Sequence, residues 1–171
     1  MRVMPLALWH RGPASELVDW AHRQSLVTHG HPLSQVCCAL FCLWATKLLE
    51  GEEDGFEQAC EQLDKIYATN IQWVDHAQEL EGVLSAPQKN NPQGSGYVID
   101  CLWSARHAFL SSENFEEVIA TAIAFGRDTD TTAAVAGALA GVRSGENALP
   151  RVWLEDLATD ISLTRCLEIL S

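Results

Sequence analysis

The spacing of hydrophobic residues predicts helices along almost the whole chain. Apolar residues recur at i, i+3 and i+4 in residues 16–27, and again from Pro32 to Glu50, where Gly51 ends the pattern. No stretch alternates apolar and polar residues as a half-buried strand would. Further helices are predicted over residues 56–80, 97–110 and 115–125, in the Ala- and Gly-rich segment after Thr131, in a segment led by Pro150, and in a last helix ending at Leu170. The predicted fold class is all-α.

The size of the chain limits the number of domains. With 171 residues, 47% of them hydrophobic, the sequence can form one core but is too short for two independent ones. It contains no fixed-period repeat and no long linker rich in Pro, Gly or Ser. We therefore expect one domain over residues 1–171.

Charge and cysteine content restrict the partners and the compartment. The formal net charge is −12 and the pI is about 4.7, so we expect neither nucleic acid nor an anionic membrane as a partner, because phosphate binding requires clustered Lys and Arg. The cysteines form no C-x-x-C pair, and no signal peptide precedes them. Reduced thiols and a cytoplasmic location are expected. The six cysteines are Cys37, Cys38, Cys42, Cys60, Cys101 and Cys166.

The segment from Gly126 to Gly141 contains the strongest candidate for chemistry. Asp128 and Asp130 are two residues apart, so in a turn both carboxylates can face one point, and Thr131 adds a neutral oxygen. This all-oxygen set suits a hard cation such as Mg²⁺. The alternative is helix capping, because Asp and Thr favour helix N-termini without any metal.

Two loops carry further candidate residues. Thr28–Pro32 presents His29 and His31 between two helices, where they can contact a ligand or serve in capping and loop hydrogen bonds. Gly94, Ser95 and Gly96 precede a helix and can offer backbone N–H groups to a phosphate; alternatively, Ser95 is only a capping residue.

The remaining histidines and the tryptophans are assigned structural roles. We expect His10, His22, His76 and His107 at surface or boundary positions, because each stands alone in a polar or amphipathic stretch. The tryptophans are expected to be core or boundary aromatics. They are Trp9, Trp20, Trp44, Trp73, Trp103 and Trp153.

Five segments, taken in order, resemble one family over essentially the whole chain. They are Met1–Leu8, Thr28–Pro32, Gly94–Asp100, Gly126–Thr131 and Leu149–Leu154. The family is that of the ADP-ribosylglycohydrolases. The resemblance implies an all-α, orthogonally packed fold that holds two Mg²⁺ ions, with Mn²⁺ as an alternative, and that hydrolyses the bond between ADP-ribose and a protein side chain or small molecule.

The resemblance also implies roles for single residues. Asp128, Asp130 and Thr131 would be metal ligands, and His29 would lie near the ADP-ribose. Gly94, Ser95, Gly96 and Tyr97 would line the same pocket. A water held by the metal would attack the anomeric carbon, but the sequence identifies no general base, and it leaves the linkage that is cleaved open.

The family's N-terminal half, which contains a Gly-Asp-x-x-Gly segment, a Glu and an Asp-Asp-Thr metal motif, has no counterpart in this chain. The sequence thus resembles a C-terminal half, and we expect a homodimer or a complementing N-terminal half as partner. Two alternative functions for this chain follow from the resemblance. One is a Mg²⁺-dependent glycohydrolase acting on ADP-ribosylated protein or an ADP-ribose-like small molecule. The other is an inactive remnant that binds ADP-ribose or another protein.

Overall fold

A computed structural model describes residues 1–156, which contain nine α-helices and no strand. This confirms the predicted all-α class. The helices are α1 (Met4–Trp9), α2 (Ala14–Leu26), α3 (Pro32–Leu49), α4 (Phe56–Ala68), α5 (Val74–Ser85), α6 (Val98–Ser111), α7 (Phe115–Ala124), α8 (Thr129–Ser144) and α9 (Arg151–Asp156). Short 3₁₀ turns lie at Ile71–Trp73, Pro87–Lys89 and Glu146–Ala148. The predicted last helix, ending at Leu170, lies outside the described residues.

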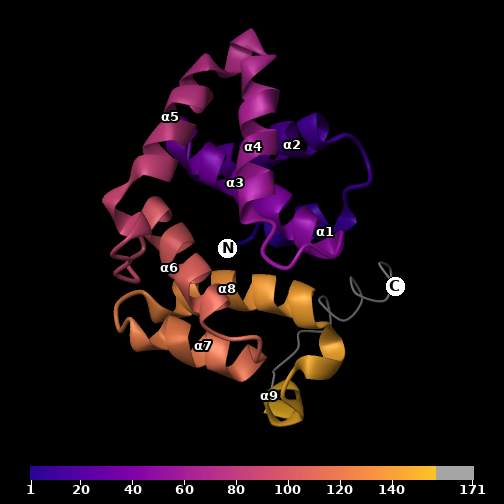
Figure 1. Ribbon diagram of the computed structural model, residues 1–171, viewed down its shortest axis with the longest axis vertical. Helices are drawn as coiled ribbons and strands as arrows, with labels where there is room; N and C mark the ends of the chain where they lie inside the picture. The colour runs from indigo at the N-terminus through magenta and orange to yellow at the C-terminus, as the bar shows by residue number, and fades with distance from the viewer. Residues whose placement is uncertain (157–171) are drawn as a thin grey trace.

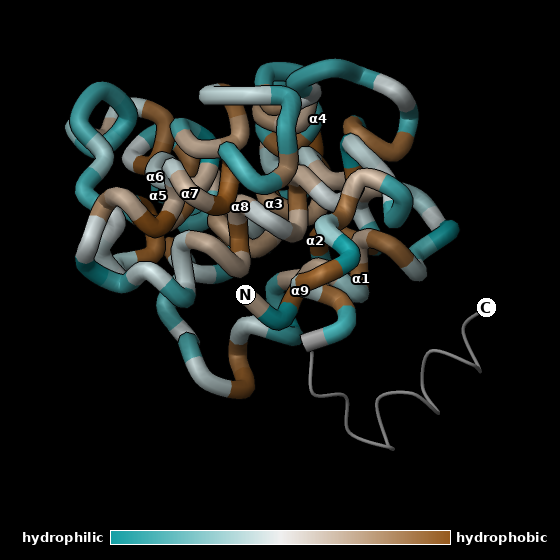
Figure 2. The backbone as a smooth tube through the Cα atoms, turned by 90° about the horizontal axis from the view of Figure 1, so that it is seen from below, coloured by the Kyte–Doolittle hydropathy of each residue, from teal (hydrophilic) through white to brown (hydrophobic). Residues whose placement is uncertain are grey.

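Helix α3 forms the centre of the structure. It begins at Pro32, and His31 caps it by accepting a hydrogen bond at Nδ1 from the backbone N–H of Leu33 (3.2 Å). It packs against α1, α2, α4, α5, α6 and α8. By length and composition alone α3 could cross a membrane, but 61% of it is buried inside the fold, as expected of a core helix. Figure 2 shows hydrophilic loop segments at the rim of the molecule.

The helices form two groups, with α2–α5 in the upper part of Figure 1 and α6–α9 in the lower part. The start of the chain lies between the two groups. In the lower group α8 packs on both α6 and α7. A Cβ atom at Gly137 of α8 would come within 2.7 Å of Ile119 Cδ1, so the missing side chain lets α7 approach closely. The small residues of α8 therefore serve helix packing.

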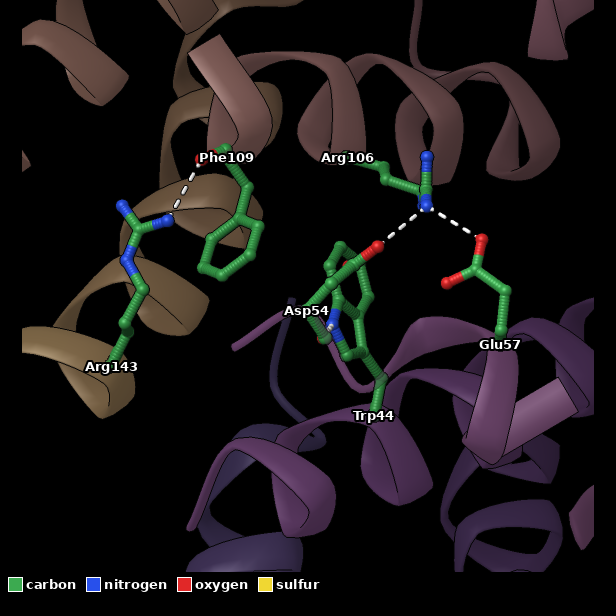
Figure 3. A network of polar contacts seen from close by, with 6 residues as sticks. All are labelled: Trp44, Asp54, Glu57, Arg106, Phe109 and Arg143. Carbon is green, nitrogen blue, oxygen red and sulfur yellow. Dashed lines mark hydrogen bonds and ion pairs between the residues drawn. The ribbon is translucent and has the colours of Figure 1, made fainter. Parts of the chain in front are cut away.

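A partly buried arginine connects the two groups. The guanidinium of Arg106 on α6 donates to Asp54 (2.7 Å) and to Glu57 (2.9 Å), which precede and begin α4 (Figure 3). Its Cζ lies 4.5 Å from the centre of the Phe56 ring. Burial raises the pKa of Asp54, and the positive charge of Arg106 partly opposes this rise. The ion pairs compensate a charge that packing has removed from water.

The predicted helical region 56–80 is divided in the structure. Helix α4 ends at Ala68, because the Thr69 hydroxyl donates to the carbonyls of Lys65 (3.2 Å) and Ile66 (3.0 Å) and Asn70 adopts an extended conformation. The Asn70 side chain then accepts from the backbone N–H of Gln72 (3.0 Å) and starts the next turn. Ser, Thr and Asn compete with the helix for backbone groups in this way. The predicted helical region is thus present, but as two α-helices with a short 3₁₀ turn between them.

Three tryptophans also differ from the prediction. Trp44 and Trp103 are buried and Trp73 is partly buried, but Trp9, Trp20 and Trp153 are 70%, 47% and 45% exposed. The assignment of all six to the core or its boundary was wrong. Trp9 ends helix α1, an element that the sequence pattern did not predict.

A buried polar cluster corrects the assignment of His22, whereas His76 is partly buried and thus at the expected boundary. His22 is only 3% exposed; its Nε2 lies 2.9 Å from the Tyr67 hydroxyl, and its ring stacks on that of His76 with centroids 4.4 Å apart. His76 in turn contacts the Gln35 side chain (3.1 Å). Each histidine looked isolated in the sequence because its partners lie on other helices.

Candidate functional site

One pocket of about 350 Å³ gathers residues from distant parts of the chain. Its walls come from the start of the chain, the end of α2, the α2–α3 loop, α3, the start of α6 and the start of α8. The lining residues are Met1, Arg2, Val3, Gln24, Ser25, Thr28, His29, Ser34, Cys38, Gly96, Val98, Cys101, Asp128 and Thr131. The pocket thus joins four of the segments that the sequence singled out.

The α2–α3 loop places its two histidines in different roles. The backbone N–H of His29 donates to the Ser25 carbonyl (2.8 Å), and the Ser25 hydroxyl donates to the His29 carbonyl (3.0 Å). The His29 side chain lines the pocket, whereas His31 caps α3. His31 thus takes the capping role, whereas contact of His29 with a ligand stays a prediction.

Two buried side chains fix the loop before α6. Asp100 is 2% exposed, and its carboxylate accepts hydrogen bonds from the backbone N–H groups of Gln93 (2.8 Å) and Ser95 (2.7 Å). The Ser104 hydroxyl accepts from the backbone N–H of Gly94 (2.9 Å). The N-cap of α6 is Tyr97, which makes no side-chain cap bond. Ser95 as the capping residue was thus a wrong prediction. The loop is held instead by hydrogen bonds to Asp100 and Ser104, which belong to α6.

Gly94 joins this loop to the turn before α8. It has a positive φ of 67°, which favours glycine, and a Cβ atom there would overlap Phe125. Its carbonyl accepts a hydrogen bond from the backbone N–H of Asp128 (2.8 Å). The two candidate loops are therefore one structural unit.

The acidic end of α8 lies at the pocket wall. Asp128 occupies the N-cap position, but its carboxylate makes no capping hydrogen bond. Hydrogen bonding with the Thr131 side chain, and to a smaller extent with Asp130, lowers the pKa of Asp128 below its usual value. The carboxylate is therefore ionised at neutral pH, as a metal ligand must be.

The structure brings some of the predicted residues together and leaves others outside. His29, Gly96, Asp128 and Thr131 share the pocket. Gly94 is buried behind it, and Asp130 is exposed in the first turn of α8. Ser95 lines a neighbouring pocket of about 280 Å³ together with Arg127, and Tyr97 is 52% exposed.

The sequence did not single out several lining residues. Arg2 is the one Lys or Arg side chain that lines the pocket among residues 1–156, and only its place in the N-terminal motif could have indicated it. Cys38 and Cys101 contribute thiols; burial raises the pKa of both, that of Cys101 to about 11. Both thiols are therefore protonated at physiological pH, and the thiolate is the nucleophilic form of cysteine. All five cysteines of the described range are free.

The donor set limits what the chain could hold. No group of three or more His, Cys, Asp or Glu residues within 1–156 could hold a metal ion. The pair Asp128 and Asp130 with the Thr131 hydroxyl offers two carboxylates and one neutral oxygen. Mg²⁺ is commonly bound by one or two carboxylates while it keeps several waters, so this set fits a hydrated Mg²⁺ ion.

Comparison with known proteins identifies relatives over nearly the whole chain. A family model for ADP-ribosylglycohydrolase matches residues 1–170. The chain is 28% identical to the ADP-ribosyl-(dinitrogen reductase) glycohydrolase of Rhodospirillum rubrum, over 92% of this chain and 49% of that protein. It is 29% identical to the ADP-ribosylarginine hydrolase Tri1 of Pseudomonas putida strain GB-1, over 92% of this chain and 41% of the relative.

A third relative is the ADP-ribosylarginine hydrolase Tri1 of Serratia proteamaculans strain 568. It is 25% identical over 99% of this chain and 44% of the relative. The chain thus spans about half the length of the curated relatives it matches.

Proposed function

This chain belongs to the ADP-ribosylglycohydrolase family, and we propose that it provides part of an active site that hydrolyses ADP-ribose from a modified protein. ADP-ribosylarginine is the first linkage to test, because two of the relatives are named for it. The free cysteines support the expected cytoplasmic location.

The observation that carries this proposal is the shared pocket. Arg2, His29, Gly96 and Asp128 stand far apart in the sequence, and the fold brings them around one volume of about 350 Å³. That volume lies within the range of small-molecule sites. A cationic side chain, an imidazole, a glycine loop and a carboxylate together suit a ligand that carries phosphates and hydroxyl groups.

We assign the divalent ion to the start of α8. Asp128, Asp130 and Thr131 would hold it, and Gly96 leaves open the space beside Asp128 that a larger residue would fill. When bound, Mg²⁺ would neutralise the diphosphate of ADP-ribose against the carboxylates and polarise the attacking water. Mn²⁺ is the alternative ion.

The protein residues then have separable roles. His29 and Arg2 would bind and orient the ligand from the side of the α2–α3 loop. The backbone around Gly94 and Gly96 would bring the ligand close to Asp128, because glycine leaves no side chain in between. No described residue is assigned as general base.

Part of the catalytic machinery is expected to come from a second chain segment. Two carboxylates suffice for one weakly bound Mg²⁺ but leave the two-ion centre of the family incomplete. We propose that a complementing N-terminal half, or a second copy of this chain, supplies the remaining ligands and the general base.

Calorimetry with ADP-ribose, in the presence and absence of Mg²⁺, tests the proposal. We expect weak binding that depends on the cation, because the diphosphate and Asp128 are both anionic. An Asp128→Asn variant is the matched control and should lose the cation dependence. A release assay on an ADP-ribosylated arginine substrate accompanies the calorimetry.

The outcomes separate the two functions. Cation-dependent binding without turnover by the isolated chain supports the shared active site. Robust turnover by the isolated chain would overturn the need for a complementing segment. Absence of ADP-ribose binding at every Mg²⁺ concentration would contradict the proposed function and favour the interaction protein.

A further inference from the structure

A chain of hydrogen bonds leads from Arg2 to the imidazole of His29. The Arg2 guanidinium donates from Nη2 to the Thr28 hydroxyl oxygen (2.8 Å) and to the Gln24 carbonyl (3.3 Å). The same Thr28 oxygen lies 2.7 Å from Nδ1 of His29. Arg2, Thr28 and His29 all line the candidate pocket.

The chemistry of the three groups sets the direction of this chain. Arginine can only donate, so the Thr28 oxygen accepts from Arg2. Among residues 1–156, the acceptor that remains for the Thr28 hydroxyl proton is Nδ1 of His29. Donation by a cation polarises the hydroxyl and strengthens its own donation. The reverse arrangement, with a proton on Nδ1, would leave the Thr28 proton without a protein acceptor.

We propose that Arg2 and Thr28 are positioning residues that hold His29 as the neutral tautomer with its proton on Nε2. In this tautomer His29 is a hydrogen-bond donor to an oxygen of the ligand, and its Nε2 is not available as a base. The identity of that ligand as ADP-ribose rests on the proposed function, whereas the tautomer does not.

The backbone of the loop is fixed independently of this relay. Ser25 binds both backbone groups of His29, and the Gln35 side chain donates to the Gly30 carbonyl (3.0 Å). His76 holds the other end of the Gln35 amide (3.1 Å). The state of the His29 ring therefore depends on Thr28 and Arg2 and not on the course of the loop.

The tautomer can be read directly from the ¹⁵N resonances of the imidazole rings. Spectra are recorded on the full chain at about pH 8, where a free imidazole is neutral. His31 is an internal reference, because its Nδ1 accepts from a backbone N–H and its proton must therefore lie on Nε2. We expect the His29 pattern to match that of His31. A His29 proton on Nδ1, or an even mixture of tautomers, would overturn the proposal.

Variants test the relay itself. Thr28→Val keeps the branched shape but removes the hydroxyl, and Arg2→Met removes the donor; both should shift the His29 ring towards a mixture of tautomers. Thr28→Ser should restore the wild-type pattern. Arg11→Met removes a charge whose hydrogen bonds within residues 1–156 go to the Leu8 and His10 carbonyls, and should leave His29 unchanged. An unchanged His29 pattern in Thr28→Val would contradict the relay.

Binding of ADP-ribose with Mg²⁺ supplies the second measurement. Loss of one oriented hydrogen bond should weaken binding about 3- to 10-fold in Thr28→Val, and Thr28→Ser should recover most of it. The expected tautomer without any ADP-ribose binding would leave the relay intact and contradict the proposed function. Equal affinity of wild type and Thr28→Val, despite a changed tautomer, would contradict the donor role of His29.

Discussion

Gly96 and Asp128 lie so close that a Cβ atom at Gly96 would overlap the Oδ2 atom of the Asp128 carboxylate. The loop before α6 and the turn before α8 meet at this point. The atom in the way is the end of a side chain, so a larger residue at 96 would displace the carboxylate and not the backbone. The absent side chain thus keeps Asp128 in its position at the pocket.

Gly96→Ala is expected to impair the metal site while leaving the fold intact. The methyl group pushes Asp128 Oδ2 away, so the affinity for Mg²⁺ should fall about 10-fold or more while the free energy of unfolding changes by less than about 1 kcal/mol. Calorimetry and thermal melting measure the two effects. Gly30→Ala, where nothing lies within 4 Å of the added Cβ, should change neither. Unaltered Mg²⁺ affinity in Gly96→Ala would exclude Asp128 as a ligand in this position.

Mg²⁺ or Mn²⁺ should stabilise the protein through Asp128 and Asp130. A cation that binds only the folded state at about ten times its dissociation constant adds about 1.4 kcal/mol, which corresponds to a rise in Tm of about 3 °C. The double variant Asp128→Asn, Asp130→Asn should lose this rise. The double variant Asp64→Asn, Asp75→Asn removes two other exposed carboxylates and should retain it. An equal rise in both double variants would place the cation elsewhere.

The sequence predicted the helices where local rules decide the structure. The periodic pattern after Pro32 and the glycine after Glu50 locate α3 to within one residue, because a helix start and stop depend on neighbouring residues. The break at Thr69 and Asn70 was missed, although both residues compete for backbone hydrogen bonds. Helix α1 was missed because its six residues give too little periodicity.

The site was only partly predictable for a different reason. Asp128 and Thr131 are close in sequence, so their pairing follows from the motif. The contact of Asp128 with Gly96 and the relay from Arg2 to His29 join segments that are far apart in the chain, and no local pattern carries that information. His22 looked solitary for the same reason, since its partners lie on α4 and α5.

Arg143 is expected to hold the end of α6 in place. Its guanidinium donates to the carbonyls of Phe109 (3.1 Å) and Ser112 (2.6 Å) and lies 4.1 Å from the Phe109 ring centre, as Figure 3 shows for the Phe109 contact. Arg143→Met should lower the free energy of unfolding by about 2 kcal/mol, because two carbonyls lose a charged donor. Denaturant melts measure this. Arg23→Met removes an exposed i,i+4 pair with Asp19 and a contact with the exposed Trp20 ring, and should cost less than about 1 kcal/mol; equal losses would refute the capping role.

The burial of His22 beside His76 makes the fold sensitive to acid. Burial, and to a smaller extent the charge of His76, lowers the pKa of His22 from about 6.5 to about 3. The unfolded chain therefore binds more protons between these values, and the stability that is present above about pH 6.5 is lost as the pH falls towards 3. His22 alone should remove about 2 kcal/mol between pH 7 and pH 5. Denaturant melts of His22→Gln should show a correspondingly smaller loss between these pH values, whereas the exposed His107→Gln should behave as wild type; a wild-type pH dependence in His22→Gln would refute the assignment.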